Sequence, residues 1–452
     1  MKIFTLVLRS IKWILIFFVV TAAILTVIYN CKPALNKDLE KLLAKDRKDT
    51  GNIKENAFYH IMHFHAPEGT DTFATGLQIS EIYNKYKSEA DRPALNEEVN
   101  NLVQSFGVFP TDNRFLLIFD EFMEKKQIQI LKNNRKLIKN LQKERSYYFR
   151  RLKELKKATY YHTPFPPFWG SSTPQYGCFT DIVKIDLALN IIDVKAGGKG
   201  IKQIQSDLKF YHNLLEHSND YSFANRFNHI LWLYYEAIDV LISNPETNKL
   251  IPADIFTDYT DVEMSAKRIF PTEVYKQYTR INNLETWRYT YVTKNFFEMI
   301  KKPGKHNFTS FWKSLTSDDN AMNNFFYQTL SDCNELLSIK SQGSIIDIEN
   351  MYNQLNSSDS PAWYASILLR NYSLFTDMNG YRDLLHLKLL IKRNNIANSE
   401  IPDYIISVSD SIRNPYTHKP MMYNADENTV YFTAPVLKDI DPKYYTRKVY
   451  LD

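Results

Sequence analysis

Three histidines, His60, His63 and His65, stand close together in the stretch YHIMHFHAP and could form a metal site. A catalytic zinc ion needs about three converging protein ligands, and a structural one about four. On a helix, His60 and His63 face the same side, but His65 lies about 140° round from His60. On a strand, His60 opposes the other two. No regular element therefore directs all three rings to one point, and neither HExxH nor CxxC occurs. We predict ordinary helix and turn residues and no metal.

Other patterns that could do chemistry are also incomplete. The stretch AGGKGIK, residues 196–202, lacks the GxxxxGK[ST] spacing of a phosphate loop and fits a connection between two helices. The stretch WGSSTPQYG, residues 169–177, contains no GxSxG elbow. Acidic neighbours such as Asp120 and Glu121 do not face each other on a helix and fit solvated surface. We predict no catalytic residue and no cofactor site. The competing hypothesis, an envelope hydrolase, would need a site assembled from distant residues.

The strongest signal is positive charge between Lys125 and Lys157, where only Glu144 and Glu154 oppose many basic residues. Such a segment costs self-repulsion unless acidic neighbours, lipid headgroups or an acidic partner relieve it. One alternative is a solvated helix whose charge is neutralised by the rest of the chain. Another is binding of nucleic acid, which would require a cytoplasmic body. The candidate surface facing a partner or lipid consists of Lys132, Arg135, Lys136, Lys139, Lys143, Arg145, Arg150, Arg151 and Lys153.

An uncharged apolar run, WILIFFVVTAAILTVIYN, occupies residues 13–30. Counted from Phe4, across two basic interruptions, it is long enough to span a bilayer core, with Trp13 and Tyr29 at its two ends where amphipathic rings favour the interface. A cleaved signal peptide is the alternative. However, the run is long for a signal peptide, and no small-x-small site ends it. We predict an uncleaved transmembrane helix, with the lipid bilayer as its partner.

The orientation of this helix rests on two opposing arguments. Basic residues in 31–48 outnumber those of the tail and would place the body in the cytoplasm. Long domains, however, translocate largely regardless of charge, and the short basic tail resembles a signal-anchor. We expect a single-pass protein of the bacterial inner membrane with a periplasmic body. In that compartment Cys178 and Cys333 could form a disulfide, and buried free thiols are the alternative.

The body should be helical, because glycine is scarce, 12 in 452 residues, and the chain is long enough for more than one helical subdomain. The most regular spacing falls between Asn113 and about Tyr160 and predicts one long helix with an apolar stripe, Ile128, Leu131, Ile138, Leu141, Tyr148, Leu152 and Leu155. Other helices are expected at 53–64, 71–87, 178–194, 200–218, 223–243, 261–268, 271–281, 284–301 and within 308–394.

The C-terminal end differs from the rest of the body. A helix at 381–394 precedes two short β-type runs, MMY and TVYF, which flank the turn-rich NADEN and predict a hairpin. The expected fold class is all-α with a transmembrane helix and a small C-terminal β hairpin. The expected divisions are a tail at 1–12, an anchor at 13–30, a neck at 31–50, helical subdomains at 51–161 and 178–394, and a hairpin segment at 395–452.

Both ends of the chain resemble a family of uncharacterised, membrane-anchored proteobacterial proteins. The run NPYTHKPMMY…NTVYF, after a helix and a proline, is similar to their ending, which is broadly like the helix-hairpin module at the C-terminus of pseudopilins. The early stretch ENAFYHIMHFHAPEGTDTFATG is similar to the segment that follows their anchor, through Asn56, Tyr59, Ala66, Pro67, Gly69, Asp71 and Gly76. The resemblance implies a periplasmic body and no particular reaction. We therefore expect a role in binding or scaffolding an envelope partner, of which protection against an envelope toxin is one version.

Overall fold

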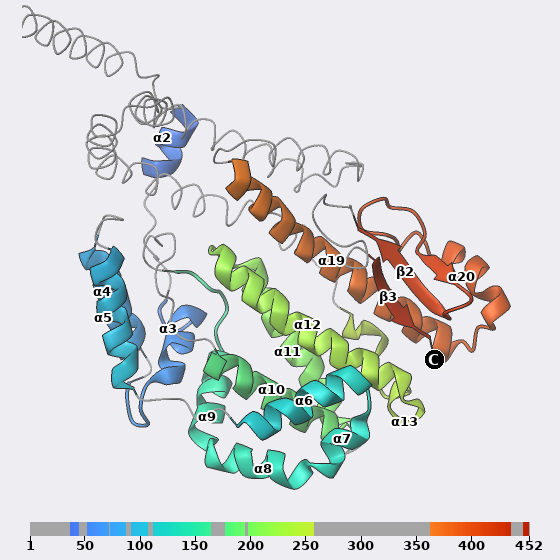
Figure 1. Ribbon diagram of the computed structural model, residues 1–452, viewed down its shortest axis with the longest axis horizontal. Helices are drawn as coiled ribbons and strands as arrows, with labels where there is room; N and C mark the ends of the chain where they lie inside the picture. Colours follow the sequence, from blue (N-terminus) through green and yellow to red (C-terminus); the bar gives the residue numbers. More distant parts are fainter. Residues whose placement is uncertain are drawn as a thin grey trace, which may run out of the picture.

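The computed structural model describes residues 37–44, 52–71, 73–86, 92–106, 112–163, 177–194, 198–256, 362–434 and 446–451. These residues are mostly helical, with a small three-stranded antiparallel sheet at the C-terminal end (Figure 1). The helical class and the hairpin are thus confirmed. Buried apolar residues form one connected core that runs from Ala57 to Leu451.

The described N-terminal part consists of five short helices: α2 (Lys37–Ala44), α3 (Ala57–Met62), the 3-10 turn η1 (His63–His65), α4 (Ala74–Lys85) and α5 (Arg92–Ser105). Asn56 caps α3 by accepting a hydrogen bond from the Phe58 amide. Gly76 allows α4 to approach α3, because an added Cβ would lie 2.7 Å from a ring carbon of Tyr59. The predicted neck, residues 31–50, is helical in its described part, which is α2.

The predicted long helix between Asn113 and Tyr160 is wrong, because four helices stand in its place. They are α6 (Asn113–Lys125), α7 (Ile128–Asn133), α8 (Arg135–Glu144) and α9 (Ser146–Leu155). Lys126 adopts a left-handed conformation (φ 52°), and Asn134 and Arg145 leave helical geometry. The breaks let the segment bend around the core (Figure 1). The predicted apolar stripe is nevertheless confirmed, since its seven residues are all buried.

Three helices form the centre of the molecule: α10 (Gly177–Ile192), α11 (Lys199–Glu216) and α12 (Tyr221–Ser243). The helix α10 contacts each of α6 to α9 as well as α11 and α12. Its sequence is apolar on most sides, as expected for a helix surrounded by others. Gly198, in the glycine-rich stretch 196–202, takes a positive φ of 71° directly before the first residue of α11. The short elements α13 (Pro245–Asn248) and η3 (Ala253–Ile255) follow α12.

The C-terminal part is built on α19 (Ala362–Arg393), which packs along α12 and carries the sheet (Figure 1). Strands β1 (Met422–Asn424) and β2 (Thr429–Thr433) form the predicted hairpin, and β3 (Thr446–Tyr450) pairs with β2. Strand β3 was not predicted from the sequence. Gly380 lets the sheet dock, because an added Cβ would lie 2.6 Å from the Phe432 ring. The elements η5 (Asn398–Glu400) and α20 (Ile401–Ser407) link α19 to the sheet.

Several predictions fall on residues outside the described set. These are the tail at 1–12, the anchor at 13–30, Cys333, residues 169–176 of the stretch WGSSTPQYG and the helices expected between 257 and 361. Within the described ranges, no helix combines the length and apolar character needed to cross a membrane. Cys178 is a buried free thiol in the structure. The division into subdomains stays a prediction.

Candidate functional site

The nine basic residues of the candidate surface do not share one environment. Lys136, Lys139 and Lys143 are exposed along one side of α8, at spacings of three and four residues that place them on the same helical face. The opposite side of α8 buries Ile138 and Leu141. Among the residues that the structure describes, these three lysines have no ion pair or side-chain hydrogen bond, and the same holds for the half-buried Lys132 and the exposed Lys153.

The four arginines of that set, in contrast, are engaged with the body. Arg135 forms an ion pair with Asp193 at 2.9 Å. Arg150 pairs with Glu68, and both side chains are well exposed. Arg145 is buried, and Arg151 is half-buried. The sequence predicted one surface for all nine residues. In the structure four of the five lysines are exposed, whereas Arg145 is buried and Lys132 and Arg151 are half-buried.

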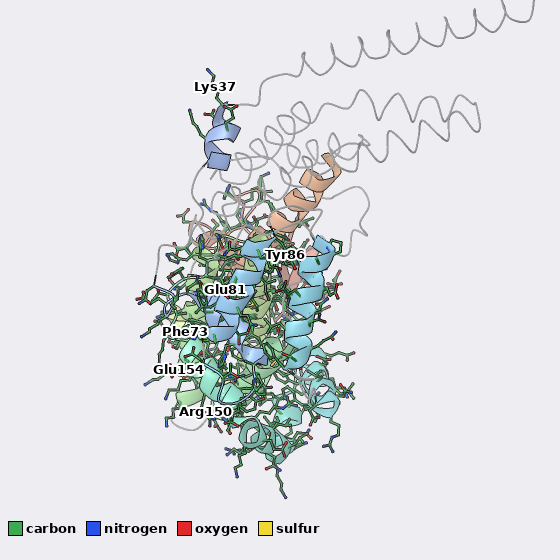
Figure 2. All side chains as sticks on the ribbon, turned by 90° about the vertical axis from the view of Figure 1, so that its left-hand side faces the viewer. Lys37, Phe73, Glu81, Tyr86, Arg150 and Glu154 are labelled. Carbon is green, nitrogen blue, oxygen red and sulfur yellow. The ribbon has the colours of Figure 1, made fainter. Side chains whose placement is uncertain are left out.

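A pocket of about 190 Å³ opens beside α9, where this helix meets α3 and the loop after η1. Figure 2 shows Arg150 and Glu154 on this side of the molecule, near Phe73 at the start of α4. A volume of this size holds a group somewhat larger than benzene. The residues that line the pocket are His60, His63, Glu68, Gly69, Thr70, Tyr147, Arg150, Arg151 and Glu154.

Arg151 fixes the wall of this pocket. Its Nη1 donates hydrogen bonds to the carbonyl oxygens of Phe64 (3.1 Å) and Ala66 (2.6 Å), and its Nη2 donates one to Pro67 (2.8 Å). The guanidinium carbon also lies 5.0 Å from the centre of the Tyr147 ring, a cation–π distance. Burial lowers the pKa of Arg151, which nevertheless remains charged at neutral pH.

The two histidines that line the pocket are buried and neutral. Burial, and to a lesser extent the nearby charge of Arg151, lowers the pKa of His63 to about 4. Burial also lowers the pKa of His60. The Nε2 of His60 donates to the Lys54 carbonyl at 2.9 Å, so its Nδ1 carries no proton and has no hydrogen-bond partner in the described structure. The Nδ1 of His63 is likewise buried without a partner.

The three histidines are helix and turn residues, as predicted, since His60 lies in α3 and His63 and His65 lie in η1. In addition, His60 and His63 line the pocket. No group of three or more His, Cys, Asp or Glu residues in the described part of the chain could hold a metal ion. Nothing in the sequence pattern indicates that the histidines lie beside the basic segment. Their proximity depends on the packing of α3 against α9, which brings together segments almost ninety residues apart.

The residues that carried the N-terminal resemblance build the same region. Ala66 and Pro67 supply carbonyl oxygens to Arg151. Gly69 takes a φ of 88°, and Asp71 accepts hydrogen bonds from the amides of Phe73 and Ala74 at the start of α4. These residues therefore shape the loop that closes the pocket.

Two further clusters of charge lie inside the body and are closed to ligands by their own partners. Lys156 sits between Asp186 (2.8 Å) and Asp207 (2.7 Å), and Tyr234 donates to Asp207. At the joint of α12 and α19, the buried Asp239 accepts hydrogen bonds from Lys126 and Lys388. We assign both clusters to the stability of the fold.

Comparison with known proteins adds no relative: no family model, curated protein or solved structure matches the chain.

Proposed function

We propose that this chain is a membrane-anchored envelope protein whose helical body binds an acidic protein partner through the exposed side of α8. The row Lys136, Lys139 and Lys143 carries the proposal, because these charges are exposed and lack ion-pair partners among the described residues. The anchor at 13–30 and the periplasmic orientation remain part of the proposal and rest on the sequence.

The packing of α8 supports a docking role. Its inner side is fixed against α10 by Ile138 and Leu141, so the three lysines project from a rigid support. Like charges at these spacings repel each other on a helix. A complementary acidic surface would relieve this repulsion and would accelerate association by electrostatic steering. The lysine row is therefore suited to recognition rather than to the stability of the isolated chain.

The test is co-purification of the tagged full-length chain with its partner from membranes, compared with the triple variant Lys136→Gln, Lys139→Gln, Lys143→Gln. The matched control is Lys199→Gln, Lys202→Gln, Lys209→Gln, which removes the same charge from exposed lysines of α11. We expect one stoichiometric partner with the wild type and the control, and its loss in the α8 variant. Equal recovery with both variants would rule out the α8 surface.

Orientation is tested separately with a reporter that is active only in the periplasm, fused after Asp452. We expect activity. A silent reporter with a normally expressed protein would place the body in the cytoplasm, where nucleic acid becomes the acidic partner to test.

The competing function, an envelope hydrolase with a non-contiguous site, is favoured by one observation: the pocket joins His60 and His63 to Glu154 from a distant helix. Its lining contains Thr70 but no Ser or Cys among the described residues. The described lining therefore lacks a serine or thiol nucleophile. Hydrolysis of generic ester, peptide or glycan substrates by the purified chain, lost in both His63→Gln and Glu154→Gln, would establish this alternative over binding alone.

A further inference from the structure

The charges around the pocket leave one positive group without a counter-ion. Glu68 is paired with Arg150, and Glu154 accepts a hydrogen bond from the exposed Lys157 at 2.6 Å. Both pocket carboxylates are thus neutralised by basic side chains at the rim. Arg151, in contrast, has no carboxylate within ion-pair distance in the described part of the chain, and Glu68 is the weakest of the charges that raise its pKa. A half-buried charge of this kind is costly unless it is compensated.

Arg151 also retains unused hydrogen-bond donors. A guanidinium has five N–H groups, and the carbonyl oxygens of Phe64, Ala66 and Pro67 take three of them. The two that remain are the Nε–H and one Nη2–H. They belong to neighbouring nitrogens, which is the arrangement with which arginine binds a carboxylate through two parallel hydrogen bonds.

The rest of the lining consists of neutral rings and small groups. The imidazoles of His60 and His63 and the phenol of Tyr147 line the pocket together with the small residues Gly69 and Thr70. The volume of about 190 Å³ accommodates a ring-sized group together with a small polar head.

From this combination we propose that the pocket binds a small organic anion with a single carboxylate, which Arg151 holds and the aromatic side chains cover. A monoanion balances the one uncompensated charge, whereas the second charge of a phosphate at neutral pH would meet Glu68 and Glu154. The site is separate from the lysine row of α8 and does not depend on the partner proposed above.

The test uses benzoate as the probe and benzamide as its neutral counterpart, with binding to the purified full-length chain measured by ligand-detected NMR. The two molecules have nearly the same shape, so the difference reports the carboxylate. We expect benzamide to bind at least about tenfold more weakly, since a hydrogen bond to a charged group contributes about 1.5–3 kcal/mol. Equal binding of benzoate and benzamide, or no benzoate binding at about 10 mM, overturns the proposal. Tighter binding of inorganic phosphate than of benzoate overturns it as well.

Variants locate the site. Arg151→Gln should weaken benzoate binding about tenfold or more, and Thr70→Trp should abolish it by filling the pocket while leaving the contacts of Arg151 in place. Lys153→Gln is the matched control, because it removes the same charge from an exposed position of α9 outside the pocket. If Arg151→Gln does not fold, Thr70→Trp decides alone. Benzoate binding that survives Thr70→Trp places the anion elsewhere and refutes the proposal.

Discussion

The joint between α12 and α19 and the outer side of α8 use the same charged residue types in opposite ways. At the joint, Lys388 is buried and donates to Asp239 (2.7 Å) and to Ser243 (2.7 Å). On α8, the lysines are exposed and lack ion-pair partners among the described residues. The comparison shows that the location of a charge in the packed structure, rather than its residue type, decides whether it stabilises the fold or remains available to a partner.

The titration of the two lysines at the joint reflects this packing. Burial lowers the pKa of Lys388, and Asp239 offsets only part of that effect. Burial also acts to lower the pKa of Lys126, but Asp239 and Glu236 outweigh it and raise the pKa. Asp239 therefore holds two cations in place from a fully buried position, and its removal would leave Lys388 unpaired.

The largest effect should follow from Asp239→Ala. Loss of one member of a buried ion pair leaves an uncompensated charge, so we expect the free energy of unfolding to fall by about 3–5 kcal/mol. Thermal and urea denaturation of the purified chain measure this change. The control is Asp193→Ala, which breaks the exposed pair with Arg135 and should cost less than about 1 kcal/mol. Similar losses for the two variants would contradict the contrast between joint and surface.

Gly380→Ala should have the next largest effect. The added methyl group would meet Phe432 and Pro415, and overpacking of this kind costs about 2 kcal/mol even though alanine favours the helix. Denaturation again measures the change. Gly177→Ala is the control, since no atom of the described residues lies within 4 Å of the added Cβ. A stabilised Gly380→Ala variant would show that the sheet does not dock closely on α19.

Acidification should weaken the fold through His63 by a smaller amount. Because the pKa is about 4 in the folded state and near 6.5 when unfolded, the unfolded chain binds the proton more readily between these values. The stability contributed by the neutral ring is present above pH 6.5, falls as the pH decreases, and is lost by about pH 4. Between pH 7 and pH 4, we expect the free energy of unfolding of the wild type to fall by about 1–2 kcal/mol more than that of His63→Gln. Parallel pH profiles for the two proteins would contradict a buried, neutral His63.

The smallest effect on stability belongs to the lysine row. The triple substitution of Lys136, Lys139 and Lys143 by Gln should change the free energy of unfolding by less than about 0.5 kcal/mol, because these side chains contact little. Its melting curve, compared with that of the α11 triple variant, measures this. A loss above about 2 kcal/mol would mean that the row supports the fold and is not reserved for a partner.

Several features could be predicted from the sequence because their causes are local. The apolar stripe from Ile128 to Leu155 requires only helical spacing, and all of its residues are buried. The hairpin requires two short β-type runs around a turn, and β1 and β2 confirm it. The breaks at Lys126, Asn134 and Arg145 could not be predicted, because no proline or glycine marks them and the curvature follows from packing around α10.

The candidate sites likewise combine features with local causes and features that depend on the packing of distant segments. The sequence by itself determined that the chain is helical, that positive charge gathers between residues 125 and 157, and that no contiguous metal or nucleophile motif occurs. Only the tertiary structure decided that Arg151 lies beside His60 and His63 while Lys139 faces outward. The physical reason is that periodicity defines the sides of each helix separately. Which sides meet depends on how several helices bury their apolar surfaces together.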